Sequence, residues 1–130
     1  MLTLRSVSVE DIELLHAWRN DPESRANSHY TGIVDREMFG AKIRELLDSP
    51  HSQLFIGEID GVAVGHVRID SGMVSFMVAP EHRRQGIGRA LVAAIMDRSP
   101  LIAEVKPGNE ASRRIFESLG WHLDTLTYRR

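Results

Sequence analysis

The residues best suited to chemistry lie in one basic, glycine-containing stretch, Ala79-Pro-Glu-His-Arg-Arg-Gln-Gly-Ile-Gly-Arg89, which joins an apolar run to a helical pattern. The first turn of a helix carries unpaired backbone N–H groups and a partial positive charge, and both attract phosphate groups. Gly86 and Gly88 would let an anion approach the backbone, and the arginines add mobile positive charge. We therefore expect a pyrophosphate site here, against the alternative of a solvated basic turn whose arginines face water.

Two other phosphate-binding motifs fit this stretch poorly. A P-loop ends in Gly-Lys-Ser/Thr, where this sequence has Gly88-Arg89-Ala90. The dinucleotide fingerprint needs a third small residue where Leu91 stands, although Glu104 lies at a tolerable distance for the acidic residue of that motif. A nucleotide-phosphate binder is therefore a lower-ranked hypothesis for this chain.

Length and composition limit the kind of protein that can hold such a site. With 130 residues, 42% of them hydrophobic, the chain is expected to form one domain over residues 1–130. The lack of cysteine excludes disulfides, thiolate zinc sites and cysteine nucleophiles, and no metal is expected. A net charge of -2 gives no general attraction to nucleic acid or anionic membranes, so any basic site must be local. With neither a signal sequence nor a membrane-spanning run, we expect a cytoplasmic protein with no nucleic-acid or membrane partner.

Helical periodicity and capping residues predict four helices. Ser8 is placed to cap the first helix, and Asp21-Pro22 to end it, because the residue before a proline avoids helical geometry. The polar residues 23–32 are expected to form a loop, Asp35 to cap the second helix, and Gly120 to terminate the last. The expected helices are 8–21, 35–49, 86–98 and 109–119.

Apolar runs separated by turn residues predict the strands. Asp60-Gly61 suits a two-residue hairpin turn, and Ser71-Gly72 makes the next turn, so three strands in a row should form an antiparallel meander. The expected strands are 2–7, 53–59, 62–69, 73–78, 101–105 and 121–128. This order predicts an α/β (α+β) fold, a mixed sheet flanked by helices with a strand–helix–strand crossover, and the site should lie at the crossover.

The basic stretch resembles the GNAT superfamily of acyl-CoA-dependent N-acyltransferases. Residues 78–91 are similar to the family's strand, proline and Arg/Gln-x-x-Gly-x-Gly/Ala motif at the start of a helix. A second match over 105–121 stands at the family's usual distance, where a helix lies beside the CoA arm. The resemblance covers nearly the whole chain. It implies a single GNAT-like domain with a mixed, mostly antiparallel sheet of about six strands, four flanking helices and a splayed strand pair.

The resemblance also implies the reaction, which is transfer of an acetyl group from acetyl-CoA to a primary amine by direct attack on the thioester. In such enzymes the pantetheine arm lies between the splayed strands, the amides of 85–90 hold the pyrophosphate, and the later block borders the thioester. The cofactor-binding residues implied here are Met77, Val78, Arg83, Arg84, Gln85, Gly86, Ile87, Gly88, Arg89, Ala90, Asn109 and Phe116.

Two features depart from the family pattern. Many members carry a tyrosine that protonates the departing thiolate where this chain has Phe116, so water or Ser112, one turn earlier, would have to serve. The closing hairpin strand usual in the family is also missing before Arg130, and a homodimer is expected to cover the exposed edge. These departures motivate a second hypothesis from another class, a catalytically silent CoA-binding module.

Three residues besides Ser112 are candidates for moving a proton. Glu104 stands among apolar residues beside the proposed cleft, where a buried carboxylate could act as general base, although pairing with an arginine is slightly favoured. Glu58 and His66 lie on the central hairpin, and an ordinary surface or hydrogen-bonded histidine is the favoured interpretation of His66.

The acceptor amine is expected to enter over the first two helices. Trp18-Arg19-Asn20-Asp21-Pro22 is similar to a stretch in GNAT members that acetylate nucleotide-linked amino sugars, and in members that acetylate protein N-termini. Arg19 and Arg25 could meet an anionic substrate, and Trp18 is better explained as a core residue. The amino-sugar interpretation is slightly preferred over a peptide N-terminus, although Glu37-Met38-Phe39 lacks the histidine common in the sugar-modifying group. The predicted substrate-binding residues are Trp18, Arg19, Asn20, Arg25, His29 and Tyr30.

Overall fold

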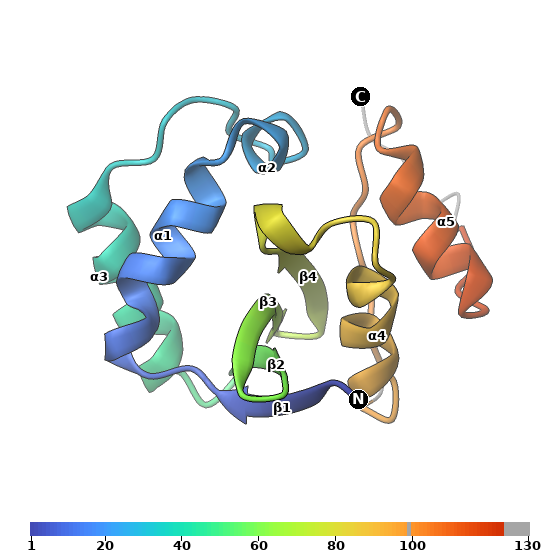
Figure 1. Ribbon diagram of the computed structural model, residues 1–130, viewed down its shortest axis with the longest axis horizontal. Helices are drawn as coiled ribbons and strands as arrows, with labels where there is room; N and C mark the ends of the chain where they lie inside the picture. Colours follow the sequence, from blue (N-terminus) through green and yellow to red (C-terminus); the bar gives the residue numbers. More distant parts are fainter. Residues whose placement is uncertain (99, 124–130) are drawn as a thin grey trace.

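A computed structural model describes residues 1–98 and 100–123 of the chain. A twisted sheet stands between two groups of helices, with α1 and α3 on one side and α4 and α5 on the other (Figure 1). The strands are β1 (Thr3–Ser6), β2 (Ser52–Ile59), β3 (Val62–Asp70) and β4 (Met73–Val78). The helices are α1 (Ile12–Asn20), α2 (Pro22–Ala26), α3 (Arg36–Asp48), α4 (Ile87–Ala94) and α5 (Glu110–Ser118), with 3-10 turns at Val9–Asp11 and Pro80–His82.

The sheet has the order β1-β2-β3-β4, and all three pairings are antiparallel. Asp60 and Gly61 have φ angles of 52° and 78°, and Ser71 and Gly72 have 50° and 84°. Two consecutive positive φ angles define the two-residue turn that matches the twist of a hairpin. The predicted hairpin turns and the antiparallel meander are therefore confirmed.

Apolar side chains form a separate cluster on each side of the sheet. Leu15, Trp18 and Ile43 pack α1 and α3 against β2, and the exposed fraction of Trp18 is 4%, so it is a core residue rather than a substrate contact. On the other side, Leu91 and Ile95 of the α4 segment pack against β3 and β4. The apolar residues repeat at the helical period, so each helix has one apolar face, and burial of these faces holds both helix layers against the sheet.

The predicted loop 23–32 begins with a helix instead. Asp21 accepts hydrogen bonds from the amides of Glu23 and Ser24 at 3.1 and 3.3 Å and so caps α2. Pro22 occupies the first helical position, where its missing N–H costs nothing and its fixed φ suits a helix. The same proline that ends α1 therefore begins α2, so a fifth helix is added to the four predicted.

The expectation of about six strands is wrong for the described residues, in which four strands pair. Residues 101–105 were expected to be a strand, but they contribute only one parallel bridge, between Met73 and Ile102. Of the predicted last strand, 121–123 are not in a strand and 124–128 lie outside the described residues. A search of the described residues finds no helix with the length and apolar character of a membrane span.

Candidate functional site

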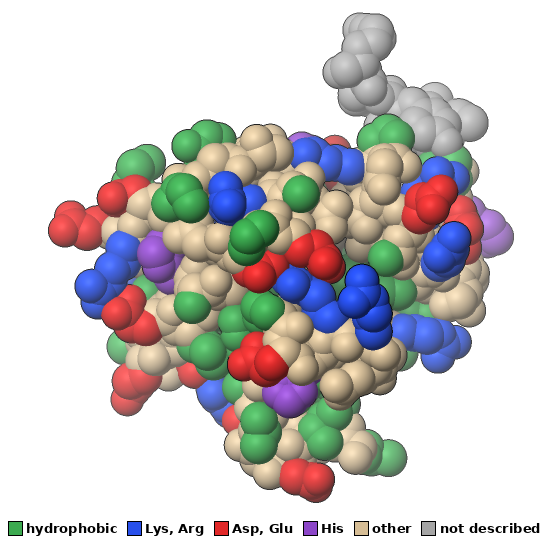
Figure 2. All heavy atoms as spheres, turned by 45° about the horizontal axis from the view of Figure 1, so that its top comes forward, with side chains coloured by type: hydrophobic (Ala, Val, Ile, Leu, Met, Phe, Trp, Pro, Cys, Tyr) green, Lys and Arg blue, Asp and Glu red, His purple; other side chains and the backbone are tan. Residues whose placement is uncertain are grey.

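A cleft of about 960 Å³ opens between the two helix groups, over the free edge of β4. Figure 2 shows lysine and arginine side chains gathered beside a hollow near the middle of this face, with acidic side chains next to them. Seven arginine and lysine side chains line the cleft against three carboxylates, so it attracts anions although the whole chain has a charge of -2. The cationic residues are Arg19, Arg68, Arg83, Arg84, Arg89, Lys106 and Arg114, and the acidic ones are Glu23, Asp70 and Glu104.

The loop before α4 presents its backbone to this cleft. Gly86 caps the helix in the left-handed conformation, at φ 77°, and a Cβ built on it would meet no atom within 4 Å. The amide of Ala90 donates to the Gly86 carbonyl at 3.1 Å, so the amides of residues 87–89 precede the first intrahelical bond. These donors and the helix dipole give the turn the geometry that the predicted pyrophosphate site requires, and anion binding itself stays a prediction.

Gly88 has a different function from the one predicted. It is buried, and a Cβ there would lie 2.9 Å from the Phe76 ring and 3.0 Å from the Ile115 side chain. Glycine is therefore needed for close packing of α4 against β4 and α5, rather than for access of an anion. Gln85 and Ala90 are not among the described residues that line the cleft, and the Ala90 amide is already bonded to the Gly86 carbonyl, so Ala90 offers no donor to an anion there.

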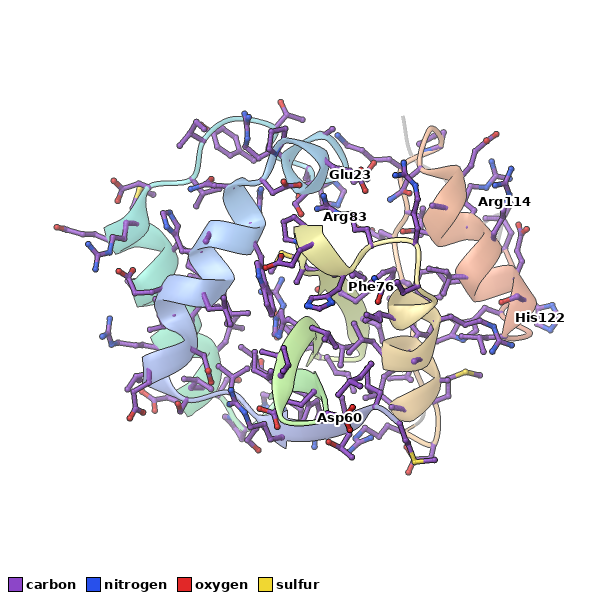
Figure 3. All side chains as sticks on the ribbon, viewed as in Figure 1. Glu23, Asp60, Phe76, Arg83, Arg114 and His122 are labelled. Atoms are coloured by element: carbon purple, nitrogen blue, oxygen red, sulfur yellow. The ribbon has the colours of Figure 1, made fainter. Side chains whose placement is uncertain are left out.

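Arg83 connects the loop to α2. Its guanidinium donates to Asp21 at 2.6 Å and to the Ser24 hydroxyl at 3.2 Å, and it lies 3.2 Å from a carboxylate oxygen of Glu23 (Figure 3). Burial alone would raise the pKa of Asp21, but the hydrogen bonds from Arg83 and from the α2 amides outweigh it and hold that pKa below its ordinary value. Arg83 thus positions the loop, which leaves Arg84 and Arg89 as the loop's more exposed cations.

The strand pair beside the loop separates beyond its first residues. The amide of Val74 donates to the Ile102 carbonyl at 2.8 Å, and the Ile102 amide donates to Gly72 at 2.9 Å. The bridge between Met73 and Ile102 is the only β pairing of β4 with residues 101–106, all of which the structure describes. A gap therefore opens towards the end of β4, as the expected splayed pair requires.

Strand parity decides which backbone groups face this gap. Alternate residues of an antiparallel strand direct both N–H and C=O away from the bonded neighbour, and Val74 is of this kind because it bonds Ile102. Phe76 and Val78 share its parity and face the gap. Met77 faces β3 instead, and its carbonyl oxygen lies 2.8 Å from the Cβ position of Gly65. Of the two predicted residues, Val78 can present its backbone there and Met77 cannot.

Phe116 and Asn109 are occupied by structural contacts at the edge of the cleft. The Phe116 ring is buried, with its centroid 6.0 Å from that of Phe76 and 4.8 Å from that of Trp121. The Asn109 side chain accepts from the Ser112 amide at 3.2 Å and caps α5. Both residues and Ser112 line the cleft, so α5 is anchored with one face towards the proposed thioester end.

The four proton-transfer candidates lie in different surroundings. Glu104 lines the cleft, but its side chain is 52% exposed and sits 3.4 Å from His29, so the expected burial is wrong. Glu58 accepts from Arg5 at 2.8 Å and is not among the cleft residues, because its side chain is bound to the β1 edge of the sheet. Ser112 and His66 line the cleft.

His66 is a buried, neutral histidine. Its Nδ1 lies 2.8 Å from the Phe55 carbonyl, which can only accept, so Nδ1 carries the proton and Nε2 is the acceptor. Burial, with a smaller contribution from the charge of Arg68, lowers the pKa of His66 to about 4, although the bond to Phe55 acts in the opposite direction.

Two of the predicted substrate residues hold the loop after α2 rather than the acceptor. Asn20 donates to the Val34 carbonyl at 3.0 Å and accepts from the Val34 amide at 2.7 Å. Arg25 donates to the Asn20 carbonyl at 3.1 Å and to the Thr31 carbonyl of that loop at 3.4 Å. Neither lines the cleft, whereas Arg19, His29 and Tyr30 do.

The order of the elements, the glycine turn that opens α4 and the open strand edge agree with one family. A model of the acetyltransferase (GNAT) family matches residues 12–121. The chain belongs to this family. The matched residues include the loop before α4 and the whole of α5, which the sequence resemblance singled out.

Two relatives and one solved structure illustrate the likeness to the GNAT family. The chain is 33% identical over 76 residues to the peptidyl-lysine N-acetyltransferase YiaC of Escherichia coli K12, covering 56% of this chain and 52% of the relative. It is 31% identical over 77 residues to the ribosomal protein bS18-alanine N-acetyltransferase of the same strain, covering 54% and 52%. The chain thus spans about half the length of these relatives. A Salmonella typhimurium structure described as yncA, a putative acetyltransferase with its cofactor acetyl-CoA, shares the fold at a TM-score of 0.72, with 23% identity over 92% of this chain and 79% of that one.

Sequence reasoning missed Arg68 as a cleft residue. Arg68 lies on β3 between Val67 and Ile69, which are buried on the opposite face, so strand alternation could have placed it on the same face as His66. It also missed Lys106, whose Nζ donates to the Ala26 carbonyl at 3.1 Å and so joins the crossover segment to α2. No sequence pattern predicts that long-range contact.

Proposed function

We propose that this GNAT member transfers an acetyl group from acetyl-CoA to a primary amine. The observation that carries the proposal is the open backbone edge of Phe76 and Val78, directly beside the left-handed turn at Gly86. The strand edge would pair with an extended arm that carries amides, and the turn at Gly86 would bind a pyrophosphate. When bound, acetyl-CoA supplies a thioester whose carbonyl carbon can accept an amine.

The loop and strand residues would divide the binding between them. The amides of residues 87–89 would donate to the pyrophosphate, with Arg84 and Arg89 adding charge at its exposed side. Backbone groups of Phe76 and Val78 would pair with the pantetheine amides. An N–H at this edge would also donate to the thioester oxygen as negative charge develops on it, the usual form of oxyanion stabilisation.

Proton transfer would use groups at the mouth of the cleft. An alkyl amine is protonated at neutral pH and must lose a proton before it can attack. Glu104, paired with His29 at 3.4 Å, is the carboxylate placed to accept that proton directly or through water. The Ser112 hydroxyl on α5 would protonate the departing thiolate, because the buried Phe116 ring has no proton to donate.

Two kinds of acceptor fit the proposal. A small amine, such as a nucleotide-linked amino sugar, is supported by the similarity of residues 18–22 to sugar-modifying members and by the arginine-rich cleft. An amine of a polypeptide, at an N-terminus or a lysine, is supported by the names of the two relatives. Arg19 and Arg68 on the cleft wall favour an acceptor that carries negative charge.

Thiol release from acetyl-CoA tests the proposal. We expect release to depend on an added amine in a panel of nucleotide-linked amino sugars, ribosomal-protein N-terminal peptides, polyamines and aminoglycosides. Thermal stabilisation by acetyl-CoA without release for any member would support the silent CoA-binding module instead. Stronger stabilisation by ATP or NAD than by acetyl-CoA would count against CoA binding altogether.

A further inference from the structure

Two arginines line the cleft away from the cofactor loop, on the wall formed by α1 and β3. Arg19 lies in the last turn of α1, and Arg68 lies on β3, paired in register with Ser75 of β4. Both side chains line the cleft. Burial is the largest cause that lowers the pKa of Arg19, followed by the charge of Arg25 and then by the charge of Arg68. The two guanidiniums of the pair are therefore near enough to repel each other.

Each of the two guanidiniums has a buried donor without an acceptor. Within residues 1–98 and 100–123, neither forms an ion pair with a carboxylate. Arg19 donates through Nη2 to the Tyr30 carbonyl at 2.9 Å, but its Nη1 is buried without a hydrogen bond. Nε of Arg68 is buried and unbonded as well. Unpaired buried charge is costly, so a ligand that brings acceptors to these donors is favoured.

The carboxylates of the cleft are engaged elsewhere. Glu23 pairs with Arg83 at 3.2 Å, and Glu104 lies 3.4 Å from His29. Asp70, two residues after Arg68, accepts from the Ser52 hydroxyl at 2.8 Å. Its charge raises the pKa of Arg68, yet burial is the larger cause and the pKa stays below the ordinary value. In the described part of the chain these two guanidiniums therefore have no ion-pair partner, and Asp70 acts on Arg68 only through its charge at longer range.

We propose that Arg19 and Arg68 bind an anionic group of the acceptor, so that the molecule acetylated is a primary amine that also carries a carboxylate or a phosphate. This inference rests on the acetyl transfer proposed above. Guanidinium groups present a planar fork of donors that matches both anions. His66 pairs with Met77 near the end of β4. Arg68 lies two residues further along β3, which is about 7 Å from His66 along the strand. The anion would then lie a few bonds from the amine that reaches the open edge at Val78.

Matched amines that differ only in the anionic group test this inference. We would measure kcat/KM for O-phosphoethanolamine against ethanolamine, and for lysine against pentane-1,5-diamine. The wild type should prefer the anionic member of at least one pair by about ten- to one-hundred-fold, as expected for a charged hydrogen-bonded contact. The pair that shows the preference identifies phosphate or carboxylate as the anion. Equal values within both pairs would overturn the inference.

Single substitutions assign the preference to the arginines. Arg68→Gln and Arg19→Gln should each reduce the ratio of the anionic to the neutral amine at least tenfold, mainly through KM. Arg44→Gln removes the same charge from the exposed face of α3 and should leave the ratio unchanged. If Arg68→Gln does not fold, Arg68→Lys keeps the charge but loses the fork, and its ratio should fall as well. A ratio that persists in folded variants of both arginines would contradict the assignment.

A binding measurement separates this inference from the proposed function. With CoA at saturation, the preferred anionic amine, O-phosphoethanolamine or lysine, should raise the melting temperature of the wild type and have no effect on the Arg19→Gln/Arg68→Gln double variant, and no rise in the wild type would also overturn the inference. An equal rise in both proteins would overturn the arginine site and leave acetyl transfer intact. Failure of acetyl-CoA to bind the wild type would instead defeat the proposed function, and this inference with it.

Discussion

His66 illustrates at the residue scale how the cleft wall differs from ordinary surface. The imidazole is buried, and its Nδ1–H is fixed by the Phe55 carbonyl. Sequence reasoning favoured an ordinary surface or hydrogen-bonded histidine, and the bond to Phe55 confirms that second description. Because burial lowers its pKa, His66 presents an uncharged acceptor to the cleft at neutral pH, beside the charged Arg68.

The low pKa of His66 predicts a loss of stability in mild acid. Well above pH 6.5 the imidazole is neutral in both folded and unfolded chains. As the pH falls from 6.5 towards 4, the unfolded chain takes up a proton that the folded chain does not, so unfolding becomes easier by up to about 3 kcal/mol. The free energy of unfolding, measured by denaturant titration at several pH values, should fall across this window.

A matched pair of variants isolates the contribution of His66. His66→Asn keeps a side-chain donor for Phe55 but does not titrate, so its stability should change less between pH 6.5 and 4. His51→Asn replaces an exposed histidine and should retain the wild-type pH dependence. An identical slope in the wild type and in His66→Asn would mean that other groups cause the acid sensitivity.

At the scale of elements, α4 depends on a glycine for its contact with β4 and α5. Adding a methyl group at Gly88 would push on the Phe76 ring, which is held in turn by Phe116. Overpacking of this kind typically costs 1–3 kcal/mol, more than the helix propensity gained on replacing glycine by alanine, about 1 kcal/mol.

Because the Cβ would lie only 2.9 Å from the Phe76 ring, we expect a cost of about 2–3 kcal/mol, so Gly88→Ala should lower the free energy of unfolding by about 1–2 kcal/mol net. Chemical denaturation followed by circular dichroism measures this change. Gly108→Ala is the control, because a Cβ at Gly108 would meet no atom within 4 Å. Equal stability of Gly88→Ala and the wild type would show that α4 can move away from β4 without cost.

The elements that sequence reasoning predicted well are those with local causes. The hairpin turns follow from residues that tolerate positive φ, and α3 follows from the Asp35 cap, which accepts from the Met38 amide at 2.9 Å. The elements missed depend on distant partners. Residues 101–105 are apolar enough for a strand, but they bond β4 only at Ile102 because the two segments then separate.

The same distinction holds for the site. The glycine turn that opens α4 is contiguous in sequence, and its backbone geometry at Gly86 is determined locally, so the turn could be predicted. Side-chain roles could not, because they depend on contacts between distant segments. Arg83 binds Asp21 from 62 residues away, and Glu58 binds Arg5 from 53 residues away.

On the scale of the whole molecule, the chain has a charge of -2 but concentrates cations around one cleft. Acidic side chains on the outer faces offset this local excess, so the field at the cleft mouth favours anionic ligands over polycations. A CoA pyrophosphate at one end of the cleft and an anionic acceptor at the other would both use this field. The homodimer expected from the exposed sheet edge stays a prediction.

The most direct test of the account is the affinity for acetyl-CoA of two glycine variants, measured by isothermal titration calorimetry. Gly86 and Gly61 have φ angles of 77° and 78°, and a Cβ at either would meet no atom within 4 Å, so leucine carries the same backbone penalty at both. Gly86 caps α4 beside the cleft, whereas Gly61 lies in the turn between β2 and β3, away from it. We predict that Gly86→Leu weakens acetyl-CoA binding about 100-fold or more, through loss of charged hydrogen bonds at the turn, while Gly61→Leu binds as the wild type does. Equal affinity in the two variants would contradict the placement of the pyrophosphate at the start of α4.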